Sequence, residues 1–223
     1  MIPDLSTILV KATADWMVIN KPEGFDVLTL SRFYQARTHF YPVHRLDKDT
    51  SGLWLIATHQ EALASLSTLF EKRLITKHYI AIGMGRAKKK QGKIIGDMTR
   101  TRRSQWKLER SQNQPAETTF VSINMAPSQR LYWLSPKTGK THQLRVAMKA
   151  NGTPIAGDGI YAKQDCARFD RLYLHAHQLA FVWNDKSVSL SVMPKTGSLF
   201  TSETFSKHYQ ILQNKLARIN QDQ

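Results

Sequence analysis

One nine-residue stretch, residues 44–52, places the tightest constraint on how this chain can fold. It reads His-Arg-Leu-Asp-Lys-Asp-Thr-Ser-Gly and combines two cations, two carboxylates, two hydroxyls and a glycine. Small polar residues ending in glycine favour a tight turn, because they hydrogen-bond to their own backbone and glycine accepts a positive φ. The apolar run that follows, residues 53–57, is short and predicts a buried strand. We therefore expect one carboxylate, Asp47 or Asp49, on a tight loop at a sheet edge; a charged surface turn is the alternative.

The charge of the chain indicates an anionic partner. Its 223 residues include 32 Lys and Arg against 17 Asp and Glu, a formal net charge of +15. A surplus of this size favours nucleic acid, with a membrane surface as the alternative. No apolar run is long enough to span a bilayer, and residues 1–11 lack the pattern of a secretory signal, so we expect a cytoplasmic protein without a membrane partner. The single cysteine, Cys166, excludes an intrachain disulfide and a thiolate metal cluster.

The order of predicted elements favours one α+β domain around a largely antiparallel mixed sheet flanked by helices. We expect residues 1–13 to be an N-terminal lead-in and residues 14–223 to form the domain. Thr58-x-x-Glu61 is a capping-box pattern that predicts the start of a helix ending near residue 74. Further strands are predicted over 15–20, 77–83, 116–125, 130–135 and 172–183, and further helices from 138–141 to about 151 and over about 202–219.

The segment 86–110 is the most basic part of the chain. Ten Lys and Arg residues stand there against Asp97 and Glu109, and two glycines predict a ragged hairpin. We favour contacts with RNA for this insertion because its charge is of one sign, whereas mixed charges would serve solubility as well. A solvated loop is the alternative. The residues expected to contact the RNA backbone are Lys88, Lys89, Lys90, Arg100, Arg102 and Arg103.

Several kinds of chemistry lack their motifs in this chain. There is no glycine-rich nucleotide loop and no nucleophile elbow. His175 and His177 would face the same side of a strand, but a metal site needs further ligands at matched spacing. Structural hydrogen bonds are the better interpretation of these histidines, and we expect no metal.

Three residues remain as candidates for chemistry: Asp47, Tyr79 and Arg145. An aspartate beside an arginine stays ionised, because the cation favours the charged form. An ionised carboxylate can attack a sugar carbon, stabilise an oxocarbenium-like centre or accept a proton. A tyrosine offers a ring face for stacking and a hydroxyl for proton transfer. On a basic chain, this combination indicates chemistry on a nucleoside within RNA.

The stretch 44–52 resembles the signature of the RluA-type family of RNA pseudouridine synthases. Four further segments agree in order, so the resemblance covers roughly residues 14–195 and is specific. These segments are Asn20-Lys21-Pro22-x-Gly24, Lys77-His78-Tyr79-x-Ala81, Thr138-Gly139-Lys140-Thr141-His142-Gln143-Leu144-Arg145 with Gly152-x-Pro154-Ile155-x-Gly157-Asp158 after it, and Leu174-His175-Ala176.

The resemblance implies a pseudouridine synthase fold and an isomerase that converts uridine in RNA to pseudouridine without a cofactor. It implies that Asp47 is the catalytic aspartate, acting either on C1′ of the sugar or on the C2′ proton. Arg145 would pair with Asp47 and keep it ionised. Tyr79 would pack against the uracil, with Leu144 on the other face. Arg45 would fill the gap left by the flipped nucleotide. Asp49 is then expected to be a bystander.

The matched motifs imply further substrate contacts. They involve His44, Leu46, Thr50, Lys77, Lys140, His142 and Gln143. The chain departs from the family at two positions: Lys140 stands where arginine is more frequent and Ala147 where histidine is frequent, which leaves the RNA contacts there open.

The S4-type RNA-binding module of many relatives has no room before the first predicted strand, near residue 14. We therefore expect a monomeric, stand-alone catalytic domain acting on a stem-loop of ribosomal or transfer RNA. Two other functions are considered: a catalytically idle RNA-binding or ribosome-assembly factor, and an RNA glycosidase that releases uracil.

Overall fold

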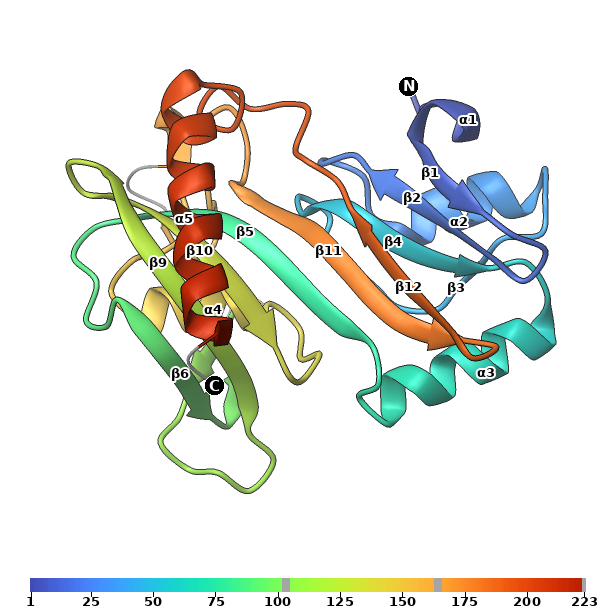
Figure 1. The fold of residues 1–223 in the computed structure, drawn as a ribbon, viewed down its shortest axis with the longest axis horizontal. Helices are drawn as coiled ribbons and strands as arrows, with labels where there is room; N and C mark the ends of the chain where they lie inside the picture. The colour runs from blue at the N-terminus through green and yellow to red at the C-terminus, as the bar shows by residue number, and fades with distance from the viewer. Residues whose placement is uncertain (102–104, 163–165, 222–223) are drawn as a thin grey trace. The chain divides into compact units, whose positions relative to one another are not determined.

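The computed structural model describes residues 1–101, 105–162 and 166–221 (Figure 1). The chain forms two compact units. Unit 1 consists of residues 1–77 and 175–193, and unit 2 of residues 78–174 and 194–223. The chain passes between the units three times, so each unit joins segments that are far apart in sequence. In the described parts of the chain, no helix is both long and apolar enough to cross a lipid bilayer.

Unit 1 is built on a sheet with β4 (Ser51–Ala57) at its centre. One edge of β4 pairs antiparallel with β2 (Trp16–Lys21), and β1 (Leu9–Ala12) pairs antiparallel with β2. The short strand β3 (Tyr41–Pro42) pairs antiparallel with the end of β4. Every residue of β4 is buried, which is typical of a strand covered on both faces. The apolar run predicted as a buried strand is therefore confirmed.

The late segment of unit 1 supplies two more strands. β11 (Leu174–Trp183) runs parallel to β4, and the register places Ala176 opposite Gly52. β12 (Lys186–Ser191), which the sequence pattern did not predict, forms an antiparallel hairpin with β11. Strand β11 begins two residues later than predicted, at Leu174.

Three helices complete unit 1: α1 (Leu5–Ile8), α2 (Val27–Gln35) and α3 (Gln60–Glu71). Residues 1–13, predicted as a lead-in before the domain, contribute α1 and β1 instead. The N-cap of α3 is His59, whose Nδ1 accepts a hydrogen bond from the Ala62 amide at 3.3 Å. The predicted capping box is wrong by one residue, because the Thr58 hydroxyl donates to the Ala14 carbonyl instead.

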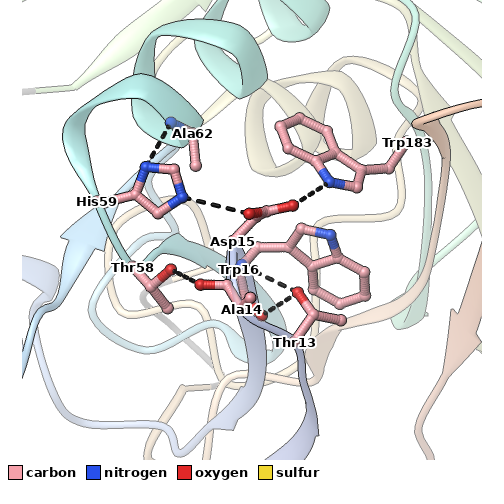
Figure 2. Close-up of polar contacts among 8 residues, drawn as sticks. All are labelled: Thr13, Ala14, Asp15, Trp16, Thr58, His59, Ala62 and Trp183. Atoms are coloured by element: carbon pink, nitrogen blue, oxygen red, sulfur yellow. Dashed lines mark hydrogen bonds and ion pairs between the residues drawn. The ribbon is translucent and has the colours of Figure 1, made fainter.

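Figure 2 shows how polar contacts join three turns of unit 1 around Asp15. One carboxylate oxygen accepts from the Trp183 indole at 2.8 Å, and the other contacts Nε2 of His59 at 3.3 Å. The hydrogen bond from Trp183, assisted by that from His59, lowers the pKa of Asp15. The end of β11 and the start of α3 are thereby fixed to the β1–β2 turn. Beneath this cluster, Trp16 packs edge-on against Phe181 in the core of unit 1.

Unit 2 contains an antiparallel run of strands in the order β5, β10, β9, β6. Their bounds are Thr76–Met84 for β5, Gln129–Pro136 for β10, Ala116–Ala126 for β9 and Gln91–Gly96 for β6. Along β9, buried residues alternate with less buried ones, as expected when one face of a strand packs on a core. The predicted fold class, α+β with a largely antiparallel mixed sheet, is confirmed.

The basic segment 86–110 is only partly a hairpin. β7 (Met98–Arg100) and β8 (Trp106–Leu108) pair antiparallel as a small separate ribbon. The preceding strand β6 instead joins β9 at the sheet edge, which the prediction of a simple ragged hairpin missed. Arg102 and Arg103, two of the expected RNA contacts, lie outside the described residues.

The described part of unit 2 also contains two α-helices and a short 3-10 helix, η2 (Cys166–Arg168). α4 (Gln143–Ala150) ends at Asn151 and Gly152, as predicted. α5 (Glu203–Gln221) lies across β9 and β10 in Figure 1 and confirms the predicted C-terminal amphipathic helix. Its residues Phe205 and Leu212 are fully buried in the core of unit 2.

The glycine at the start of β4 gives a test of the fold. Gly52 has φ +113°, and a Cβ there would lie 2.3 Å from the Ala176 carbonyl oxygen. We expect Gly52→Ala to lower the free energy of unfolding by roughly 3 kcal/mol or more, because a left-handed backbone and overpacking each cost about 1–3 kcal/mol. Urea unfolding measures the loss.

Gly24→Ala is the matched control, because Gly24 has φ +81° and an added Cβ would meet nothing within 4 Å. Only the backbone cost of about 1 kcal/mol is expected there. Equal losses in the two variants would contradict the close approach of β4 and β11.

Candidate active site

Asp47 lies in an irregular loop between β3 and β4, in unit 1. Its carbonyl accepts a hydrogen bond from the Thr50 amide at 3.1 Å, which closes the tight turn that the sequence predicts. The Asp47 residue is partly buried, whereas Asp49 is exposed to solvent. The two carboxylates therefore differ in burial, and the choice of Asp47 as the reactive one stays a prediction.

The loop that carries Asp47 is anchored by a buried lysine. Lys21 is 0% exposed, and its Nζ donates to the carbonyls of Pro22 at 2.7 Å, Phe25 at 2.8 Å and Lys48 at 3.0 Å. Lys48 directly follows Asp47, so the Lys21 ammonium links the end of β2 to the candidate catalytic loop. The sequence placed Lys21 in a family motif but predicted no role for it.

Histidines of β11 fix the start of β4, just after the loop. The Ser51 hydroxyl and Nδ1 of His175 are 2.7 Å apart, and both residues are buried. Nε2 of His175 and Nδ1 of His177 both contact the Val192 carbonyl, at 3.1 Å and 2.6 Å. These contacts support the structural role that the sequence predicts for the two histidines.

His44 has a structural role that its sequence motif did not reveal. Its Nε2 accepts a hydrogen bond from the Leu55 amide at 3.0 Å, and its ring stacks on Phe70 at 4.8 Å between centroids. Burial, with a smaller effect from the Lys77 ammonium, lowers the pKa of His44 to about 3. The ring is therefore neutral at neutral pH, and it holds the backbone of β4. The predicted contact of His44 with the substrate stays a prediction. Lys77 itself lies over the Phe70 ring at 5.3 Å.

Arg145, in unit 2, is held by a buried carboxylate. Its Nε and Nη2 each donate to Asp158 at 2.8 Å, with 5% of the Arg145 side chain and 0% of the Asp158 side chain exposed. Asp158 also accepts from the amides of Ile160 and Tyr161. The sequence predicted a partner for Arg145 in Asp47 and missed Asp158. The signal was present, because Asp158 ends the matched third motif.

Tyr161 is a second neighbour of Arg145 that the sequence did not predict. The guanidinium of Arg145 lies 5.4 Å from the centroid of the Tyr161 ring. The Tyr161 hydroxyl accepts from the Trp106 amide at 3.0 Å and lies 3.0 Å from Nδ1 of His142. An aromatic ring fixed at its hydroxyl and a bidentate carboxylate together restrict Arg145 to one orientation.

Gln143 has internal hydrogen bonds that the sequence did not predict, and its predicted contact with the substrate stays a prediction. Its Oε1 accepts from the Thr138 hydroxyl and the Lys140 amide, at 2.7 Å and 3.0 Å. Its Nε2 donates to the Glu117 carbonyl and the Thr118 hydroxyl, at 2.9 Å and 3.0 Å. Both donors and both acceptor positions of the amide are thus used within unit 2. The predicted helix start at residues 138–141 is a loop instead, because His142 has φ +57° and α4 begins after it.

The other predicted residues occupy varied environments. Tyr79 lies on β5 opposite Leu134 and packs against the core of unit 2, where Leu144 is 7% exposed. Leu46 and Thr50 are buried in unit 1, and among the described residues the Thr50 hydroxyl has no hydrogen-bond partner. The exposed predicted contacts are Arg45, Lys88, Lys89, Lys90, Arg100 and Lys140.

The predicted site residues divide between the two units. Unit 1 holds Asp47, Arg45 and the loop around them, and unit 2 holds Tyr79 and Arg145. Within each unit the structure fixes the neighbours of these residues. The pairing of Arg145 with Asp47 stays a prediction.

Comparison with known proteins identifies the family. The model of the RNA pseudouridylate synthase family matches residues 15–150, more than half of the chain. The chain belongs to this family. An uncharacterized RNA pseudouridine synthase of Haemophilus influenzae is 42% identical over 211 residues, which cover 91% of this chain and 94% of that protein. The dual-specificity RNA pseudouridine synthase RluA of Pasteurella multocida is 38% identical over 168 residues, covering 73% and 75% of the two chains.

A solved structure supports the same assignment. Human RNA pseudouridylate synthase domain containing 1 is 28% identical, with a TM-score of 0.73 and coverage of 86% of each chain. The protein is therefore an isomerase of the RNA pseudouridine synthase class, as the resemblance predicted.

The neutral His44 ring predicts a pH dependence of stability. The folded pKa of about 3 lies below the ordinary value of 6.5, so the unfolded chain binds a proton first as the pH falls. Stability from this group is complete above pH 6.5 and declines toward pH 3, by about 1.4 kcal/mol per pH unit. We expect the contribution of His44 to the free energy of unfolding, measured by urea unfolding, to be about 2 kcal/mol smaller at pH 5 than at pH 7.5.

His44→Asn should remove this part of the pH dependence, and His39→Asn, at an exposed position, should retain it. A slope against pH that is the same in wild type and His44→Asn would contradict the buried neutral ring.

The anchoring lysine gives a second stability test. Lys21→Met removes three hydrogen bonds from a buried cation and leaves the carbonyls of Pro22, Phe25 and Lys48 without that donor. We expect a loss of roughly 3 kcal/mol or more in the free energy of unfolding, since each charged hydrogen bond contributes about 1.5–3 kcal/mol. Lys11→Met, at an exposed position of β1, is the control and should change stability by less than about 0.5 kcal/mol. Similar stabilities of the two variants would exclude an anchoring role for Lys21.

Proposed function

We propose that this protein isomerises specific uridines of ribosomal or transfer RNA to pseudouridine, with Asp47 as the catalytic carboxylate. The observation that carries the proposal is the anchored loop of unit 1, in which His44 is bound to β4 before Asp47 and Lys21 holds the Lys48 carbonyl directly after it. Membership of the family supports the reaction class, and the relative from Pasteurella multocida is named as a dual-specificity synthase.

The reaction rearranges one nucleotide without adding or removing atoms overall. The bond between the sugar C1′ and the uracil nitrogen breaks, the uracil rotates, and a carbon–carbon bond forms to the same C1′. A proton then leaves the newly bonded uracil carbon and a nitrogen regains one. An ionised Asp47 can serve either as the nucleophile at C1′ or as the base at C2′, because both roles need a negatively charged carboxylate.

The other predicted residues take supporting roles in this mechanism. Arg145 pairs with Asp47 and keeps it ionised, and its bidentate contact with Asp158 holds the guanidinium ready for that contact. Tyr79 packs against the uracil and acts in the final proton transfer. Because the reacting sugar carbon is shielded in a stacked strand, the nucleotide is flipped out, and the exposed Arg45 fills the gap.

The surplus of positive charge supports binding to the phosphates of the RNA. Unstacking a nucleotide costs a few kcal/mol, and contacts between cations and phosphates offset this cost. The formal net charge of +15 allows the chain described here to make such contacts with its own surface.

Asp47→Asn and Asp49→Asn form a matched pair that tests the proposal. We expect Asp47→Asn to slow pseudouridine formation by roughly 10³-fold or more, because it removes the ionised carboxylate, and to leave RNA binding intact. Asp49→Asn should retain the wild-type rate. RNA from cells that lack the protein is the substrate, and pseudouridine mapping by carbodiimide modification and primer extension identifies the target and gives the rate.

The product distinguishes the possible functions. Pseudouridine formed by wild type and not by Asp47→Asn supports the proposal. Free uracil and an abasic site would identify a glycosidase. The same pseudouridine map in RNA from cells with and without the protein would indicate an idle RNA-binding factor.

A further inference from the structure

A basic cleft of about 770 Å³ opens in unit 2. It lies where the end of β5 and the residues after it meet the β9–β10 turn and α5. Its charged lining consists of Arg86, Lys90 and Arg130, joined by His208 of α5, and no aspartate or glutamate is among its described lining residues. None of the residues predicted to be catalytic lines this cleft. Its occupant is therefore expected to be an anion bound away from the chemistry.

Arg130 is the residue that defines the cleft. It is 8% exposed, so its guanidinium is largely removed from water. Its Nε donates to the Ser122 hydroxyl at 3.1 Å, and its Nη1 donates to the Asn124 side-chain oxygen. Among the described residues, it has no carboxylate partner, and its Nη2 has no hydrogen-bond partner. A buried guanidinium balanced only by neutral groups is unfavourable unless an anion approaches it.

The surroundings of Arg130 are ordered in a way that suits a phosphate. The Ser122 hydroxyl, which accepts from Arg130, donates in turn to the Lys90 carbonyl. This chain of contacts links the buried guanidinium to the segment that carries the exposed side chains of Arg86 and Lys90. A planar guanidinium with free donors matches the oxygens of a phosphate, and flexible cations beside it add charge.

The shape of the cleft favours a polymer over a small molecule. Much of its rim is exposed, including Arg86, Lys90, Asn124 and Ser128. Sites for small ligands are largely apolar and enclose most of the ligand surface. Lys88 and Lys89, which are exposed and lie between Arg86 and Lys90 in the sequence, add positive charge beyond the rim. An open basic cleft that continues into a basic segment is suited to a phosphodiester backbone that passes across it.

We propose that this cleft binds a backbone phosphate of the RNA substrate at a distance from the target uridine. This proposal rests on the proposed function. The site would help the protein to position a stem-loop while the target nucleotide is flipped. Arg130 supplies the fixed guanidinium, and Arg86 and Lys90 supply the mobile charges.

The test compares two charge-matched double variants. Arg86→Gln with Lys90→Gln removes two charges from the rim and leaves the buried Arg130 intact. Lys186→Gln with Lys195→Gln removes two exposed charges from positions that do not line the cleft. The dissociation constant for the mapped RNA target is measured from 50 to 300 mM salt.

Each lost phosphate contact lowers the slope of log Kd against log salt concentration by about 0.7–0.9. We expect the slope of the cleft variant to be smaller than that of the wild type by about 1–2. We also expect this variant to bind the RNA target roughly tenfold more weakly at low salt. The control should stay near the wild-type slope. Equal slopes in the two double variants would overturn the assignment.

A second measurement separates RNA from a free anion. Thermal unfolding of the wild type is followed with inorganic phosphate added at constant ionic strength. Saturable stabilisation that is lost in the cleft variant, with an unchanged RNA slope, would show a site for free phosphate and overturn the RNA assignment. The test of the cleft can fail separately from the proposed function. If the cleft variant has a smaller slope of log Kd against log salt concentration but the wild type forms no pseudouridine, only the proposed activity is refuted. If the wild type forms pseudouridine and the slope of the cleft variant is unchanged, only the role of the cleft is refuted.

Discussion

The contact between the backbones of Gly52 and Ala176 is the constraint on which the rest of unit 1 depends. It brings β4 and β11 so close that no side chain fits at residue 52. The loop before β4 must then approach the sheet at a fixed angle, and the Lys21 ammonium binds that loop at Lys48. Asp47 directly precedes Lys48, so it lies next to the anchored part of this loop. The backbone geometry after Asp47 therefore helps to set its position.

Three of the buried cations are stabilised in three different ways. Lys21 donates to three backbone carbonyls, whose dipoles stabilise its charge. Arg145 has the carboxylate of Asp158. Arg130 has only a hydroxyl and an amide oxygen among the described residues. A buried guanidinium with one nitrogen left without a partner among the described residues, as in Arg130, can receive an anion.

The sequence was sufficient where burial leaves a clear apolar pattern. The strand at 53–57 could be predicted from its unbroken apolar run, and the helix over 202–219 from the helical spacing of its apolar residues. β6 could not be predicted, because Lys93 and two glycines interrupt its apolar pattern within a charged segment. The motifs pointed to Asp47 and Arg145, but they did not reveal the internal hydrogen bonds of His44 and Gln143. The direction of those side chains is set by tertiary neighbours, such as Phe70 and Glu117, that no local pattern reveals.

The interleaving of the two units has a consequence for synthesis on the ribosome. Ser51 and His175, which are hydrogen-bonded in the folded protein, are 124 positions apart. At roughly 5–20 residues per second, β4 is made about 6–25 s before its parallel neighbour β11. During that interval β4, which is fully buried in the folded protein, has unpaired backbone groups at Ser51 and Gly52. An unpaired strand edge can form hydrogen bonds with the wrong strand. The nascent chain therefore has a period of exposure that depends on translation speed, and chaperones that bind apolar strands would act in that period.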